Sequence, residues 1–192
     1  MAQFKGVFMI QLYGGQQTRA AIVRWYLEEL GIPYEFVVMD MKAGAHKQPD
    51  FLAINPMGKV PALVDGEVKL WESGAILLYL ADSQEKMPED AGARGQVYQW
   101  VLFANSTLPQ AMTGEAKETQ LPKLLTALDA ALTGKEFLVG DTLTVADVAM
   151  ASILSYAQML FQIDFSPYSA VQSYLGGMTE RSAFRKGIMG QD

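Results

Sequence analysis

The chain has 192 residues, half of them hydrophobic, with a net charge of -6 at pH 7, one histidine and no cysteine. The acidic balance, without a basic stripe, argues against nucleic acid as a partner, and no segment resembles a membrane span. Because the chain has no cysteine, it has no disulfide, no thiolate metal site and no cysteine nucleophile. A single histidine also excludes a histidine-rich metal site, so we expect no metal. Any thiol chemistry must use a thiol that the substrate brings.

The first eighty residues alternate between strand and helix patterns. Residues 8–13 form a short apolar run that predicts a strand. Apolar side chains then recur at helical spacing, at Ile22, Val23, Tyr26, Leu27 and Leu30. Gly31 is typical of a helix C-cap, and residues 34–39 predict a second strand. This order is a βαβ unit with the usual right-handed crossover.

The next stretch predicts a short irregular helix within residues 42–55 and then a hairpin. In "KVPALVDGEVKLW" the pair Asp65-Gly66 is a two-residue turn signal between two strands. Pro61 cannot donate a ladder hydrogen bond, so it should lie at the beginning or edge of a strand. A helix follows from Ser73, with its buried side chains expected at Ala75, Ile76, Leu77 and Leu80. One four-stranded mixed sheet accommodates these elements.

After the polar segment 83–90 the strand signals nearly stop. The remaining periodicity predicts helices over residues 94–104, 122–133, 145–160 and 171–184. Thr144 and Asp147 form a capping box, and Leu143 with Val148 forms a hydrophobic staple at the start of the third of these helices. We therefore predict a small α/β domain over residues 1–83 and an all-helical domain over residues 90–192.

Three segments carry a resemblance to a known family. They are "WYLEELGIPYEFV", "INPMGKVPALVDG…LWESGAILLYLA" and "LVGDTLTVADVAMASIL". These segments match, in the right order, the motifs of cytosolic glutathione transferases, and the chain resembles most of all the small bacterial and cyanobacterial, chi-like members. The resemblance implies a thioredoxin-like domain followed by an all-helical domain in a cytoplasmic homodimer. It also implies an enzyme that conjugates its co-substrate glutathione to small apolar electrophiles such as isothiocyanates. A non-catalytic glutathione-binding carrier or protein-interaction module of the same fold is the alternative.

The resemblance also assigns the glutathione site. It implies a cis bond between Val60 and Pro61, so that the Val60 backbone pairs with the cysteinyl unit of glutathione. Glu72 and Ser73 lie at a strand–helix junction, where free N–H groups suit the γ-glutamyl carboxylate. Two cations, Lys59 and His46, resemble the positions that bind the glycyl carboxylate.

The thiol-activating group stays open between several candidates. The family uses a tyrosine near the end of the first strand, or a serine or cysteine at the start of the first helix. Here Tyr13 falls on the tyrosine position, while Gln17 and Thr18 occupy the serine neighbourhood, with Thr18 its only hydroxyl. The backbone N–H groups of residues 14–19 are the third candidate. The electrophile pocket is expected between the domains, lined by Trp100, Phe103 and Met112.

Overall fold

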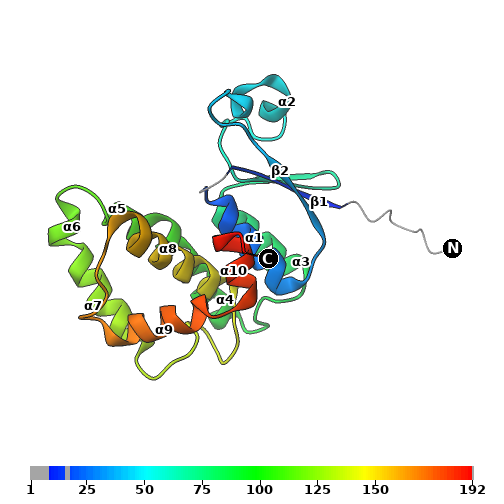
Figure 1. The fold of residues 1–192 in the computed structure, drawn as a ribbon. Helices are drawn as coiled ribbons and strands as arrows, with labels where there is room; N and C mark the ends of the chain where they lie inside the picture. The colour runs from blue at the N-terminus through cyan, green and yellow to red at the C-terminus, as the bar shows by residue number, and fades with distance from the viewer. Residues whose placement is uncertain (1–8, 16–17, 192) are drawn as a thin grey trace.

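The computed structural model describes residues 9–15 and 18–191. Its first part is a four-stranded sheet in the order β2-β1-β3-β4. In chain order the elements are β1 Ile10–Gly14, α1 Ala20–Leu30, β2 Tyr34–Val38, the 3-10 turn η1 Ala45–Lys47, α2 Pro49–Leu52, β3 Ala62–Asp65, β4 Val68–Trp71 and α3 Ser73–Ser83. The helices α1 and α3 cover one face of the sheet, and α2 lies on its other side (Figure 1).

The sheet is mixed, as the element order predicts. Strand β1 runs parallel to β2, with Leu12 opposite Phe36, and antiparallel to β3, with Leu12 opposite Leu63. Side chains alternate along β1, so the fully buried Leu12 packs into the main core while Tyr13 points to the opposite face. The hairpin turns at Gly66 and Glu67, one residue later than predicted, because Asp65 still pairs with Val68.

In the described residues of the second part, all the regular elements are helices, and loops connect them. Its elements are α4 Ala91–Leu102, the π-helical turn η2 Phe103–Thr107, α5 Leu108–Gln110, α6 Ala116–Thr119, α7 Leu121–Leu132, α8 Val145–Phe161, α9 Ser169–Thr179 and α10 Ser182–Met189. The predicted capping box is confirmed at the start of α8, where Thr144 and Asp147 bond reciprocally. Among the described residues no helix is both long and apolar enough to cross a bilayer.

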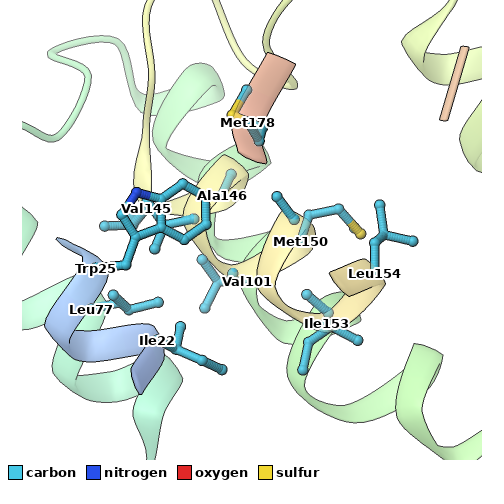
Figure 2. Packing of buried hydrophobic residues seen from close by; sticks show 14 of the residues in the cluster. Ile22, Trp25, Leu77, Val101, Val145, Ala146, Met150, Ile153, Leu154 and Met178 are labelled. Carbon is cyan, nitrogen blue, oxygen red and sulfur yellow. The ribbon is translucent and has the colours of Figure 1, made fainter. Parts of the chain in front are cut away.

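One hydrophobic core joins the two parts. Trp25 from α1 and Leu77 from α3 lie beside Val101 from α4 and Val145 from α8 (Figure 2). The central helix α8 is buried along most of its length, which explains why its sequence is apolar on nearly every side. The two parts therefore share their apolar interior, and the surfaces between them are fixed by side-chain packing.

The last helix, α10, packs directly on α1 (Figure 1). Gly187 lies against the Trp25 backbone, where a larger residue would overlap it. Nearby, the guanidinium of Arg181 pairs with both carboxylate oxygens of Glu29, at 2.6 and 2.8 Å. Close packing at Gly187 and the Arg181–Glu29 ion pair thus hold α10 against α1.

Two sequence predictions about the helices are wrong. The single helix expected over residues 171–184 is two helices, α9 and α10, because Arg181 adopts an extended backbone where it pairs with Glu29. Ala75 was expected to be buried but is exposed, because it lies on the outer face of α3. The predicted first residue of the opening strand, Phe8, lies outside the described residues.

Candidate active site

A polar groove opens where the edge of the sheet meets the start of α3. It has a volume of about 440 Å³ and is lined by Arg19, Asn55, Met57, Lys59, Val60, Pro61, Trp71, Glu72 and Ser73. The Val60–Pro61 bond is cis and lies just before β3, as the resemblance implies. The groove therefore combines the beginning of one strand, the end of its hairpin partner and a helix N-terminus.

A buried asparagine shapes the loop before the cis bond. The Asn55 amide nitrogen donates to the Lys59 carbonyl at 2.6 Å, and its amide oxygen accepts from the Met57 N–H at 3.0 Å. Asn55 is almost fully buried, so these bonds are shielded from water. Lys59 itself is exposed, which leaves its ammonium free to turn into the groove.

The junction between β4 and α3 carries a strained residue. Glu72 has a φ of 71°, in the left-handed region that non-glycine residues rarely adopt. Such strain costs on the order of 1–3 kcal/mol and is common at binding sites. The turn places Ser73 as the first residue of α3, where the leading N–H groups have no carbonyl of the preceding turn to bond. These N–H groups favour an anion at this end of the groove.

The side chain of Ser73 connects the groove to the helical part. Its hydroxyl is buried and donates to the Asn105 amide oxygen at 2.9 Å. Asn105 lies in the π-helical turn η2, and its amide nitrogen donates to the Val101 carbonyl at 3.0 Å. Single π-helical turns of this kind are frequent at functional sites.

A second cavity lies between the start of α1 and the helical part. Its volume is about 590 Å³, and its lining residues are Thr18, Arg19, Ala21, Pro109, Met112, Ile153, Tyr156, Met159, Leu160, Phe161, Ile188 and Met189. Most of these side chains are apolar. Polar character comes mainly from Thr18, Arg19 and Tyr156, all three of which are partly buried.

Arg19 lines both the polar groove and the apolar cavity. It immediately precedes α1, and its Nη1 donates to the Asn105 carbonyl at 3.4 Å. Asn105 therefore contacts Arg19 through its backbone and Ser73 through its side chain. Arg19 is thus the residue that the linings of the two cavities have in common among the described residues.

The two predicted thiol-activating hydroxyls lie on different sides of the sheet. Thr18 lines the apolar cavity, and its hydroxyl donates to the Gly15 carbonyl at 3.0 Å. Tyr13 is not among the described residues that line either cavity. Its ring packs on Phe51 of α2, its hydroxyl donates to the Gln11 amide oxygen at 3.2 Å, and burial raises its pKa. Gln17 lies outside the described residues.

The structure brings some of the other predicted residues to the site and separates others. Met112 lines the apolar cavity, whereas Trp100 and Phe103 line a separate, smaller cavity of about 170 Å³ together with residues of α7. His46 lies in η1 and does not line the groove. Its carbonyl packs near Gly58, just before Lys59, and its Nδ1 is buried without a hydrogen-bond partner in the described part of the chain.

Two family models cover nearly the whole chain. The N-terminal domain of glutathione S-transferase matches residues 9–82, and the C-terminal domain matches residues 75–182. The chain belongs to the glutathione S-transferase family. Glutathione S-transferase GstB of Escherichia coli K12 is 33% identical over an alignment of 205 positions, gaps included, that covers 94% of this chain and 98% of that protein. The predicted family and fold class are thereby confirmed.

Solved structures agree with this assignment. A glutathione transferase family member from Pseudomonas fluorescens, with two glutathione bound, has a TM-score of 0.86 and 27% identity, covering 97% of this chain and 94% of that one. Ure2p in complex with S-hexylglutathione has a TM-score of 0.85 and 25% identity, covering 96% and 100%.

Sequence reasoning missed several residues of this glutathione S-transferase site. Arg19 follows Thr18 at the predicted start of a helix. No Asp or Glu lies three or four positions away, where it could form an ion pair with Arg19, and this spacing is the sequence feature that indicates a cation without a local partner. Asn55, Asn105 and Tyr156 give no such sign, because their roles depend on contacts with distant segments. Only the folded chain assembles them.

Proposed function

We propose that this protein binds glutathione in the polar groove and conjugates its thiol to small apolar electrophiles held in the adjoining cavity. The observation that carries the proposal is that Arg19 lines both the groove and the apolar cavity. A sulfur atom at the inner end of the groove would therefore face the second substrate. The family membership and the name of the E. coli relative support the same reaction class.

The Val60–Pro61 loop suits the middle of glutathione. Val60 lies just before the interior strand β3, beyond Ala62, the last residue of that strand that pairs with β1 and β4, so its N–H and C=O belong to neither ladder and lie beside the groove. An extended peptide can pair with such groups as an added strand. We assign Val60 to the cysteinyl unit of glutathione, with Pro61 as the neighbour that sets its orientation.

The ends of glutathione carry charges that the groove complements. The γ-glutamyl end has a carboxylate, which suits the N-terminus of α3 at Ser73, and an ammonium, which suits the Glu72 carboxylate. The glycyl carboxylate suits the Lys59 ammonium in the groove lining, and His46, which the resemblance assigns to the same carboxylate, lies on the neighbouring turn η1 outside that lining. These assignments place the tripeptide along the groove with its thiol toward Arg19.

The reaction itself is a nucleophilic transfer. The bound thiol loses its proton to solvent, and a sulfur lone pair forms the new bond to the electrophilic carbon. With chlorodinitrobenzene the carbon–chlorine bond breaks and chloride leaves with its electron pair. With an isothiocyanate the carbon–nitrogen double bond opens, and the nitrogen takes a proton from water. Apolar side chains such as Met112 and Ile153 would hold the second substrate.

A side-by-side assay with chlorodinitrobenzene and an isothiocyanate tests the proposal. We expect glutathione-dependent conjugation of at least one of the two, with saturation in both substrates. Glutathione binding by calorimetry without turnover of either electrophile would favour the non-catalytic carrier. Failure to bind glutathione at all would contradict both functions.

Ser73 provides the sharper test of the groove. We expect Ser73→Ala to weaken glutathione binding by about 1–3 kcal/mol, because it removes the hydroxyl that fixes this turn against Asn105 and so holds the leading N–H groups of α3 in place for the carboxylate. Ser83→Ala is the matched control: its hydroxyl bonds the Leu80 carbonyl at the other end of α3. Calorimetry that finds the same affinity in both variants would remove Ser73 from the site.

We also propose that the protein is a cytoplasmic homodimer, as its family resemblance implies. Tyr98 and Leu102 support a partner surface, since both are exposed and lie four residues apart on one face of α4.

A further inference from the structure

The hydroxyls that the sequence offers for thiol activation are both engaged elsewhere. The Tyr13 hydroxyl donates to Gln11 on the face of the sheet toward α2. The Thr18 hydroxyl donates to the Gly15 carbonyl and accepts from the Gly15 and Ala20 N–H groups. Each hydroxyl has a single proton to donate. Some other group, one that lines both cavities, is better placed to act on the thiol.

Arg19 lines both cavities and is a permanent cation. Within the described residues its side chain donates to a neutral acceptor, the Asn105 carbonyl. Within residues 9–15 and 18–191 no carboxylate lies within the 4.0 Å of a salt bridge to Arg19. Among the described residues the positive charge is thus not cancelled by a paired carboxylate.

The other titratable groups around Arg19 leave this charge available. Tyr156 of α8 lines the apolar cavity together with Arg19, and burial raises the pKa of Tyr156 to about 12, although the Arg19 charge lowers it. Tyr156 is therefore neutral at physiological pH. In the groove, Lys59 and Glu72 bring opposite charges, and both are exposed to solvent, which screens them.

We propose that the Arg19 guanidinium stabilises the thiolate of bound glutathione and so takes the part that a hydroxyl donor plays in other members of the family. This inference rests on the proposed function, because it concerns the thiol bound at that site. A cation next to a thiol favours its charged form, and the proton leaves to solvent. Partial burial of Arg19 strengthens the effect, since less water screens the charge.

The test compares Arg19→Gln with Arg19→Lys. Thiolate absorbance of bound glutathione in the ultraviolet, followed against pH, gives the thiol pKa directly. We expect Arg19→Gln to raise this pKa by about 1 and to lower kcat/KM about tenfold near neutral pH. At a pH above the free thiol value of about 8.5, kcat/KM should return to within about twofold of the wild type. Arg19→Lys, which keeps the charge, should retain most of the effect.

Arg24→Gln is the matched control. It removes the same charge five residues further along, within α1, but the Arg24 guanidinium lies 4.8 Å from the centre of the Phe36 ring, and Arg24 lines neither cavity in the described residues. It should leave the bound-thiol pKa unchanged.

Three outcomes would overturn the inference. One is an unchanged thiol pKa in Arg19→Gln. Another is a tenfold loss of glutathione affinity with an unchanged thiol pKa, which would make Arg19 an anchor for a glutathione carboxylate. If Arg19→Gln does not fold, the thiol pKa is measured in Arg19→Lys and in the wild type instead. A bound-thiol pKa in the wild type that equals the pKa of free glutathione contradicts the proposal. Absence of glutathione binding by the wild type is a separate result, and it rejects the proposed function itself.

Discussion

Two hydroxyl side chains at the start of the chain look equivalent in the sequence but differ in their surroundings. Tyr13 packs on Phe51 at the far face of the sheet, whereas Thr18 closes the turn that begins α1 and lines the apolar cavity. Strand geometry explains the position of Tyr13, because alternate side chains of β1 point to opposite faces, whereas Thr18 lies beyond β1 in the turn before α1. A residue's position relative to a motif does not by itself say which face it occupies.

The two hydroxyls therefore predict different mutant phenotypes. Tyr13→Phe should keep kcat/KM within about twofold and cost at most about 1 kcal/mol of stability, since it removes one partly exposed hydrogen bond to Gln11. Thr18→Ala removes the bonds to Gly15 and Ala20, so it should cost about 0.5–2 kcal/mol and lower kcat/KM by displacing Arg19. Steady-state kinetics and urea unfolding measure both. A tenfold loss of activity in Tyr13→Phe would restore Tyr13 as the activating group.

At the scale of elements, the start of α8 depends on one buried carboxylate. Asp147 accepts hydrogen bonds from the Leu138 and Thr144 N–H groups and from the Thr144 and Tyr174 hydroxyls, at 2.8–3.0 Å. In Asp147→Asn an amide NH₂ would replace one of the two acceptor oxygens and face these donors. We expect a loss of about 2–4 kcal/mol in the free energy of unfolding at neutral pH, measured by urea denaturation.

The same carboxylate gives a pH dependence with a defined sign. Burial raises the pKa of Asp147 above its ordinary value of 3.8, although its hydrogen bonds oppose the shift. The folded state therefore binds this proton more tightly than the unfolded state, so stability falls as pH rises from about 3.8 through the raised pKa. Asp147→Asn should lack this contribution. A wild-type-minus-variant stability difference that increases with pH over this range would contradict the expected sign.

The contact between α10 and α1 depends on a glycine. A β-carbon at Gly187 would overlap the Trp25 backbone, which cannot move without disturbing the core. Gly187→Ala should therefore cost about 1–3 kcal/mol, the usual range for overpacking. Gly176→Ala in α9 is the control: its new methyl group would meet nothing within 4 Å, and helix propensity should stabilise it by about 0.5–1 kcal/mol. Equal thermal stability of the two variants would show that α10 can shift away from α1.

At the scale of the whole molecule, the proposed homodimer predicts a mass about twice the 21.1 kDa of one chain. Leu102 is 64% exposed on α4, and Leu102→Glu should shift the equilibrium toward the monomer by burying a charge in the interface. Val38→Glu, at a 67% exposed residue on the outer strand β2, should not. Light scattering at micromolar concentration that finds a monomeric wild type would contradict the proposal.

The features that the sequence predicted correctly are those that depend on residues close together in the chain. The hairpin around Gly66, Pro61 at the beginning of β3 and the capping box of Thr144 with Asp147 all involve partners within a few positions. Their backbone preferences and hydrogen bonds act locally, so the pattern of residues determines them. The order of these local elements in turn determined the mixed sheet and the helical part.

Only the tertiary structure decided how the site is assembled. Arg19 and Asn105 are 86 positions apart and Ser73 and Asn105 are 32 apart, so no local pattern predicts that they meet. The break before α10 likewise depends on Glu29, 152 positions from Arg181. Packing of the shared core brings these segments together, and the cavity walls follow from that packing. Local residue patterns thus predict most of the elements and the family, whereas the presence of Arg19 in the linings of both cavities depends on contacts between distant parts of the chain, which no local pattern encodes.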